Sequence, residues 1–202
     1  MSNQTTVLDY WFGKLNEDGL PLTERNSMWF GYAEATDREI EHRFGELVQS
    51  ALAGELNHWL EDEAGLIALV ILLDQFTRNI FRGTPAAFSG DEAALATAET
   101  AISKGRDRAM PTIHRVFLYI PYEHSEDLEV QERGVVLFDD LLKELEVSAK
   151  SVVIDLVAGF QQYCVAHRDV ISQFGRFPHR NEILGRATTV AEREYLERNG
   201  GF

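Results

Sequence analysis

Apolar residues along most of the chain recur at steps of three and four, the spacing of helices that bury one face. The clearest stripe lies within residues 148–173, where Phe160 and Ile171 are among its members. Residues 62–82 predict another helix, which is apolar on most sides as far as Leu73. No comparable run alternates apolar and polar residues with period two, so no strand is expected. The pattern therefore predicts an all-α protein.

Helix starts are indicated by capping boxes, in which Ser or Thr is followed three residues later by Glu. The spacing occurs three times, at Thr36 with Glu39, Ser89 with Glu92, and Thr189 with Glu192. Glycines that favour helix ends follow at Gly54, Gly105 and Gly200. These signals predict helices over residues 37–53, 90–104 and 190–198.

Two prolines and a serine organise the centre of the chain. Pro111 suits the first turn of a short helix ending near Tyr119, and Pro121 is expected to break the chain into a loop. Ser125 is expected to open the next helix. His124 would then lie beside the positive N-terminal end of that helix, which disfavours the protonated imidazole.

The architecture expected from these elements is one domain over residues 1–202, a bundle of stacked antiparallel helices. No repeated sequence signature of fixed period is present, but paired helices of this length are the units of helical solenoids. A tetratricopeptide-like arrangement is therefore the expected form of the bundle.

Charge and cysteine content exclude several classes of protein. The chain has 19 Lys and Arg against 33 Asp and Glu, a formal net charge of -14 that repels nucleic acids and anionic membrane surfaces. The single cysteine, Cys164, cannot form an internal disulfide, and the first residues lack the features of a secretion signal. We therefore expect a cytoplasmic protein with neither nucleic-acid nor membrane partners.

The first candidate cluster lies at the end of the apolar helix. Asp74, Arg78 and Arg82 continue the stripe that Ile67 and Ile71 begin. Charges on an inward face must be paired with each other, with other residues or with a ligand. The alternative is an ion pair four residues apart that merely ends a core helix.

The second candidate cluster is the turn-rich segment 174–181, which is locally basic in an acidic chain. Arg176 and Arg180 offer planar donor groups suited to carboxylate or phosphate, His179 lies between them, and Asn181 precedes a short helix. A small anionic molecule is the natural ligand of such a segment. Alternatively, the arginines only attach the loop to the body of the protein through acidic partners.

The third candidate cluster consists of polar residues on otherwise apolar stripes. His124 precedes one helix, Gln131 lies on the buried stripe of that helix, and His167 lies between Cys164 and Ile171. A single histidine on such a face is more often a core residue than a catalyst. One cleft shared with Asp74 and Arg78 would explain all of these positions.

The resulting assignment separates acid and base chemistry from anion binding. Proposed catalytic residues are Asp74, His124, His167 and His179; proposed ligand-binding residues are Arg78, Arg82, Gln131, Arg176, Arg180 and Asn181. No cofactor is expected, because the chain has no glycine-rich phosphate loop. No metal site is assigned either, because no short ligand spacing such as H-E-x-x-H is present.

The same segments resemble a family of uncharacterised bacterial proteins, domain of unknown function 924, of the tetratricopeptide-like helical class. The resemblance covers essentially the whole chain, and it implies stacked helices but no established activity. It rests on Trp11-Phe12-Gly13, Leu73-Asp74-Gln75-Phe76, Arg78-Asn79, Phe81-Arg82, Tyr119, Pro121, His124-Ser125-Glu126, Gln131, His167-Arg168, the segment 174–181 and Leu184-Gly185-Arg186.

Three hypotheses about function follow, in order of preference. The first is a cleft that binds a small anionic ligand, in a protein that could be an enzyme of unknown reaction. The second is a scaffold whose stacked helices bind a protein partner, which rests on fold analogy. The third is a metal-dependent hydrolase, in which His124 would be a metal ligand.

Overall fold

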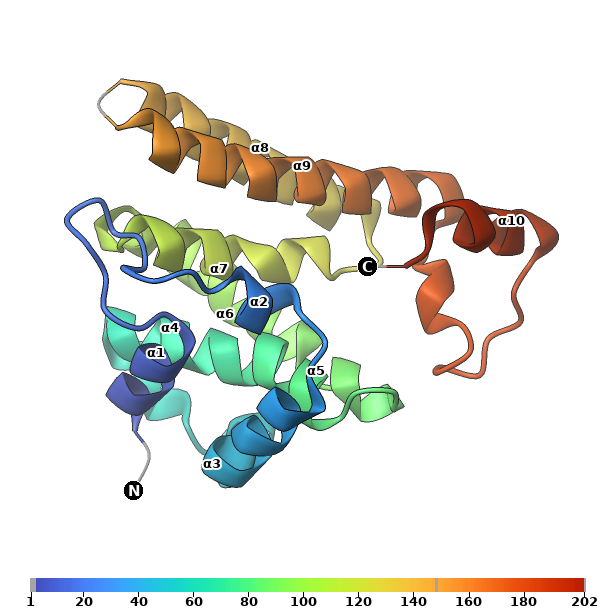
Figure 1. Cartoon of the computed structure of the whole chain (residues 1–202), viewed down its shortest axis with the longest axis horizontal. Coiled ribbons are helices and arrows are strands. Elements are labelled where there is room, and N and C mark those ends of the chain that lie inside the picture. Colours follow the sequence, from blue (N-terminus) through green and yellow to red (C-terminus); the bar gives the residue numbers. More distant parts are fainter. Residues whose placement is uncertain (1–2, 148, 202) are drawn as a thin grey trace.

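The structure, a computed structural model, describes residues 3–147 and 149–201, and it confirms the all-α class (Figure 1). Within these residues there is no strand, only an isolated bridge between Leu15 and Pro21. The α-helices are α1 (Gln4–Trp11), α2 (Asn26–Phe30), α3 (Glu34–Leu52), α4 (Glu63–Val70), α5 (Thr77–Ile80), α6 (Asp91–Ser103), α7 (Thr112–Glu123), α8 (Leu128–Glu146), α9 (Ser151–Phe174) and α10 (Val190–Asn199).

Shorter helical turns connect these helices. One is a π-helix, η2 (Ile71–Phe76), and the others are the 3₁₀ turns η1 (Asn57–Glu61), η3 (Pro85–Phe88), η4 (Arg106–Ala109) and η5 (Pro178–Arg180). None of the helices in the described ranges is long and apolar enough to cross a membrane.

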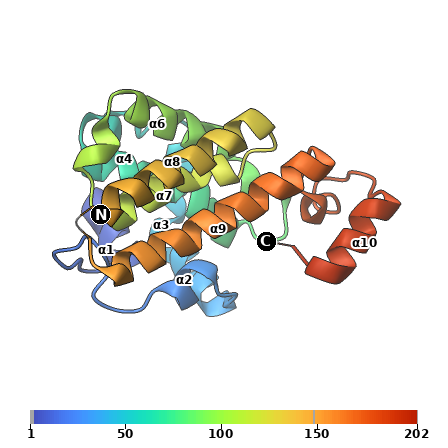
Figure 2. The same cartoon turned by 90° about the horizontal axis from the view of Figure 1, so that it is seen from above.

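The helices are stacked in layers, with the α8 and α9 pair on one side of α7 and the N-terminal helices on the other (Figures 1 and 2). The segment that contains η5 and α10 projects at the C-terminal end of α9. Edge-to-face aromatic contacts link the layers. The ring centre of Phe117 in α7 lies 6.0 Å from those of both Trp11 in α1 and Phe160 in α9. This core fixes the helix ends that carry the polar residues.

Of the three predicted capping boxes, only the last is confirmed. Thr189 and Glu192 cap α10 reciprocally. Helix α3 begins at Glu34, a turn earlier than Thr36 indicates, and α6 begins after Gly90 because the Ser89 hydroxyl donates to the carbonyl of Ala86 instead of capping the helix. A hydroxyl with a competing backbone acceptor does not define a helix start.

The predicted break at Pro121 is wrong. Helix α7 continues through this proline to Glu123, so His124 caps its C-terminal end. Almost every residue of the second half of α7 is buried, and this burial offsets the hydrogen bond that proline removes. The next helix is capped not by Ser125 but by Asp127, whose carboxylate accepts from two backbone N–H groups.

A π-helical turn lies inside the predicted helix over residues 62–82. The turn shifts the register after Val70, so Asp74 and Gln75 are both buried. Thr77 stabilises it, since its hydroxyl donates to the carbonyl of Leu73 at 2.7 Å. Such turns are frequent at functional sites, which draws attention to the polar side chains of this one.

The close approach of Gly90 to this turn yields a testable prediction. A Cβ atom on Gly90 would lie 2.1 Å from the carbonyl oxygen of Leu73, a backbone atom that cannot easily move. We expect Gly90→Ala to lower the free energy of unfolding by about 1–3 kcal/mol in urea denaturation. Gly159→Ala is the control, because α9 has open space at that position and alanine favours helices. Equal stability of the two variants would contradict this account.

Candidate functional site

The structure brings the three candidate segments together at the C-terminal ends of α7 and α9. Asp74 of η2 contacts His124, the rings of His124 and His167 are 6.2 Å apart, and His167 in turn packs on Phe177 of the C-terminal segment. Arg78 and Arg180 are joined through Asp91 of α6. We refer to Asp74, Arg78, His124, His167, His179 and Arg180 as the polar cluster.

Asp74 and His124 form a buried hydrogen-bonded pair. Asp74 Oδ1 lies 2.6 Å from His124 Nδ1, and the Gln75 amide donates to Asp74 Oδ2 at 2.6 Å. Burial alone raises the pKa of this carboxyl, but the adjacent His124, Arg78 and Gln75 together lower it below its ordinary value. An ionised Asp74 assigns the imidazole proton to Nδ1, which leaves Nε2 as an acceptor.

His124 is expected to be neutral at neutral pH, although not for the reason that the sequence indicated. Its pKa is lowered first by burial and then by the positive charge of Arg78, while Asp74 opposes the shift. As the C-cap of α7, it lies at the negative end of a helix rather than beside a positive one. An uncharged imidazole oriented by a carboxylate is the arrangement of a general base.

Arg78 and Arg180 share the carboxylate of Asp91 next to the Asp74 and His124 pair. Arg78 binds Asp91 with both nitrogens, at 2.7 and 3.2 Å, whereas Arg180 approaches Asp91 at 3.5 Å. Arg180 lies between two aromatic faces, 4.6 Å from Phe88 and 4.4 Å from Phe177. Aromatic rings hold a guanidinium in place without neutralising its charge.

Arg180 is the least satisfied member of the polar cluster. Its Nε is buried and has no hydrogen-bond acceptor within the residues that the structure describes. Burial and the charge of Arg78 lower its pKa to about 10, so it remains a cation at neutral pH. Besides Asp91, the ionised Asp74 acts on the charge of both arginines and Glu126 acts on that of Arg180.

His167 and Glu123 lie next to His124 and close to each other. His167 Nδ1 donates to the carbonyl of Tyr163 at 2.8 Å and lies 3.7 Å from a Glu123 carboxylate oxygen. Burial and the charge of Asp74 raise the pKa of Glu123 well above its ordinary value. His167 and His179 are neutral, because burial lowers their pKa values to about 3 and about 4. The site therefore combines an ionised Asp74 with a second carboxyl that resists ionisation.

Two predicted ligand-binding arginines outside the polar cluster are paired with carboxylates. Arg82 binds Asp37 with two hydrogen bonds, and Arg176 binds Glu192 and the carbonyl of Ala187. Ligand binding by these two arginines stays a prediction.

Gln131 and Asn181 brace the segments that carry the cluster. The Gln131 amide donates to the carbonyls of Glu123 and Ser125 at 2.6 and 2.7 Å, which closes the corner that holds His124. Asn181 is fully buried and accepts from Arg186 at 2.9 Å. Both are positioned to support the site, and a direct contact with a ligand stays a prediction for them as well.

Sequence reasoning missed Asp91 and Glu123 as members of the site. Asp91 lies in the first turn of a predicted helix, where acidic residues are common, so no local signal marks it as a partner of distant arginines. Glu123 was assigned to a loop because of Pro121, so its burial was not anticipated. Within residues 3–147 and 149–201, no group of three or more His, Cys, Asp or Glu is arranged to hold a metal ion.

Comparisons with known proteins agree with this fold without adding an activity. The profile of a family described as "Bacterial protein of unknown function (DUF924)" matches residues 7–200. The solved structure of a protein of unknown function from Agrobacterium tumefaciens is similar, with 35% sequence identity, a TM-score of 0.77 and 97% of each chain covered. The comparison with curated proteins found no match.

Proposed function

Since the chain belongs to the bacterial DUF924 family of proteins of unknown function, we propose a function from the polar cluster itself. The proposed function is binding of a small carboxylate or phosphate by Arg78 and Arg180, with His124 as a general base toward the bound molecule. The observation that carries this proposal is that the buried Arg180 and the partly buried Arg78 share the carboxylate of Asp91 next to the Asp74 and His124 pair.

Asp91 occupies the place that an anionic ligand would take. Its carboxylate already binds both arginines, and its side chain keeps 20% exposure, the same as that of Arg78. A ligand anion can therefore exchange with Asp91 from the solvent side. Because guanidinium groups bind planar carboxylate and phosphate with paired hydrogen bonds, either anion suits these donors.

The buried Asp74 suits His124 for proton transfer. A neutral imidazole whose Nδ1–H is held by a carboxylate can accept a proton at Nε2, and the carboxylate then stabilises the resulting charge. Arg78 raises the cost of charging His124 as long as its own positive charge is not balanced. Binding of an anion beside Arg78 would reduce this cost, which couples ligand binding to the basicity of His124.

A thermal-shift screen tests the proposal. The protein is heated with phosphorylated and carboxylated metabolites, inorganic phosphate and divalent metals, each tested singly. A ligand at 100 times its dissociation constant adds about 2.7 kcal/mol of stability. We expect stabilisation by at least one anion. It should be lost in Arg180→Gln and kept in Arg133→Gln, a control whose arginine pairs with Glu99 at an exposed site.

Asp91→Asn is expected to have the opposite effect on the affinity for the anion. Removing the competing carboxylate leaves both arginines in place, so the same anion should bind this variant more tightly than it binds the wild type. A panel without any anion effect, or an effect that Arg180→Gln leaves unchanged, would overturn the proposal. The search would then turn to protein partners.

A further inference from the structure

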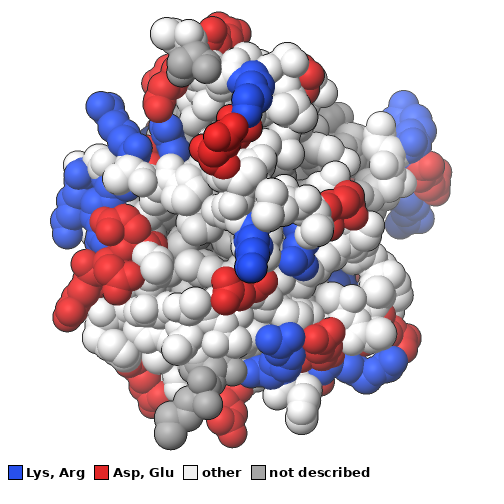
Figure 3. All heavy atoms as spheres, turned by 60° about the vertical axis from the view of Figure 1, so that its left-hand side comes forward, with Lys and Arg blue, Asp and Glu red and all other residues white. Residues whose placement is uncertain are grey.

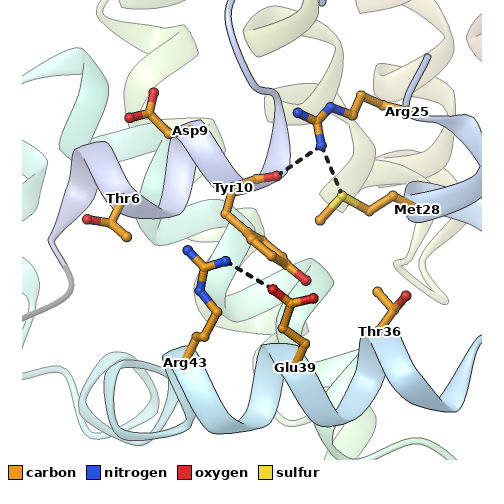
Figure 4. A pocket seen from close by; sticks show the side chains of 8 residues that line it. All are labelled: Thr6, Asp9, Tyr10, Arg25, Met28, Thr36, Glu39 and Arg43. Carbon is orange, nitrogen blue, oxygen red and sulfur yellow. Dashed lines mark hydrogen bonds and ion pairs between the residues drawn. The ribbon is translucent and has the colours of Figure 1, made fainter. Parts of the chain in front are cut away.

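A second polar site lies apart from the polar cluster, in a hollow of about 610 Å³ between α1, the start of α2, and α3 (Figure 4). Pockets for small molecules commonly have volumes of 300–1,000 Å³. None of the residues that line this hollow belongs to the polar cluster. Its walls carry the charged side chains of Asp9, Arg25, Glu39 and Arg43.

Arg25 is a cation without an anionic partner in the described part of the chain. Its guanidinium makes two long contacts, from Nη1 to the carbonyl of Tyr10 at 3.5 Å and to Met28 Sδ at 3.6 Å (Figure 4). Its buried Nε has no hydrogen-bond acceptor among the described residues. A guanidinium has five N–H donors, so most of the hydrogen-bonding capacity of Arg25 is unused.

Hydrogen bonds at the start of α2 fix the main chain at Arg25. Its carbonyl accepts hydrogen bonds from the N–H groups of Met28 and Trp29, which begins α2. The guanidinium lies against Gly13, where a Cβ atom would come within 2.3 Å of Nη2. Gly13 also has a φ of +67°, a backbone conformation that favours glycine. The unused N–H donors of Arg25 are therefore available to a carboxylate that enters the hollow.

The other charges of the hollow determine which ligand fits it. Arg43 forms an ion pair with Glu39 at 3.1 Å and stacks over the ring of Tyr10 at 4.4 Å, so these two charges neutralise one another. Asp9, at the α1 edge, makes no side-chain hydrogen bond or ion pair with any residue in the described ranges. One positive charge at Arg25 and one negative charge at Asp9 therefore remain.

We infer that this hollow binds a small zwitterion of the amino-acid class, with its carboxylate on Arg25 and its ammonium group on Asp9. Met28 and the ring of Tyr10 provide apolar surface for the remainder of the ligand. A ligand with only negative charge matches Arg25 but leaves Asp9 facing a like charge. This second site is independent of the proposed function of the polar cluster.

Isothermal titration calorimetry with the full chain tests the inference. The probes are glycine, methionine, phenylalanine and the dipeptide Gly-Phe, each up to about 10 mM, together with the N-acetyl and amide forms of phenylalanine. We expect at least one zwitterion to bind. Both blocked forms should bind about tenfold more weakly or worse, because each lacks one of the two charge-assisted contacts.

Variants then assign the contacts. Arg25→Gln and Asp9→Asn should each weaken the zwitterion by about tenfold, whereas Arg38→Gln, which removes an exposed ion pair with Glu34 on α3, should not. Circular dichroism verifies that each variant is folded. The inference is overturned if no probe binds, if N-acetylphenylalanine binds as tightly as phenylalanine, or if Arg25→Gln leaves the affinity unchanged.

Discussion

Replacing Asp74 by alanine is expected to lower the free energy of unfolding by about 3–5 kcal/mol, the largest effect that we expect from a single polar side chain. Asp74 is completely buried, and its oxygens accept from His124 and Gln75. The substitution leaves the His124 imidazole and the Gln75 amide buried without this acceptor. Urea unfolding at pH 7 measures the change.

Two further variants test the contribution of the Asp74 charge and provide a control at the surface. Asp74→Asn keeps an oxygen for His124 but removes the charge. Its free energy of unfolding should therefore lie between those of the wild type and Asp74→Ala. Asp169→Ala removes an exposed carboxylate that pairs with Arg168, and it should change stability by less than about 1 kcal/mol. Similar losses for Asp74→Ala and Asp169→Ala would show that the Asp74 and His124 pair is not the buried brace described above.

The second large effect is expected from acidification. Burial lowers the pKa values of His114, His167 and His179 to between about 3 and about 4, whereas an unfolded histidine titrates near 6.5. Below pH 6.5 the unfolded chain therefore binds protons that the folded chain does not. Each such proton costs about 1.4 kcal/mol of stability per pH unit. The stability is present above pH 6.5 and is lost as the pH falls toward the folded pKa values.

Glu123 acts in the opposite direction, because its raised pKa allows the folded chain to take up a proton before the unfolded chain does. The net loss between pH 6.5 and 5 is still expected to be on the order of 3 kcal/mol, since three histidines oppose one carboxyl. Urea unfolding at intervals of half a pH unit checks this value. His167→Gln should reduce the slope. Stability that is constant from pH 7 to 5 would contradict the neutral buried histidines.

The helical class of this protein could be predicted because the hydrophobic periodicity is long and continuous. Residues 148–173 gave the position of α9 (Ser151–Phe174) closely, since one stripe is buried over its whole length. Short elements were missed, because α1 and α2 contain too few turns to show a period. The tetratricopeptide-like arrangement stays a prediction.

Local rules failed where tertiary packing overrode them. Pro121 is tolerated inside α7 because the surrounding helix is buried. Since α7 continues to Glu123, His124 lies at a helix end and not at the predicted helix start. The π-turn at Ile71–Phe76 could not be seen from the sequence, although it determines which way Asp74 and Gln75 face. Both departures concern the segments that build the candidate site.

The candidate site was predicted as a set of residue types but not as a geometry. Asp74, His124, His167 and Arg180 could be selected because polar groups on apolar stripes or in basic loops need partners. Their actual partners come from distant segments, as Asp91 does for both arginines, and no local pattern specifies such contacts.

In the proposed function, an anion held by Arg78 and Arg180 acts on the imidazole of His124. ¹⁵N NMR of histidine-labelled protein tests it directly, by following the ring signals during a pH titration with and without the anion found in the thermal-shift screen. We expect the anion to shift the His124 signals and to raise the pKa of His124, and we expect Arg180→Gln to abolish both changes. Anion binding that leaves the His124 signals and pKa unchanged would contradict the account.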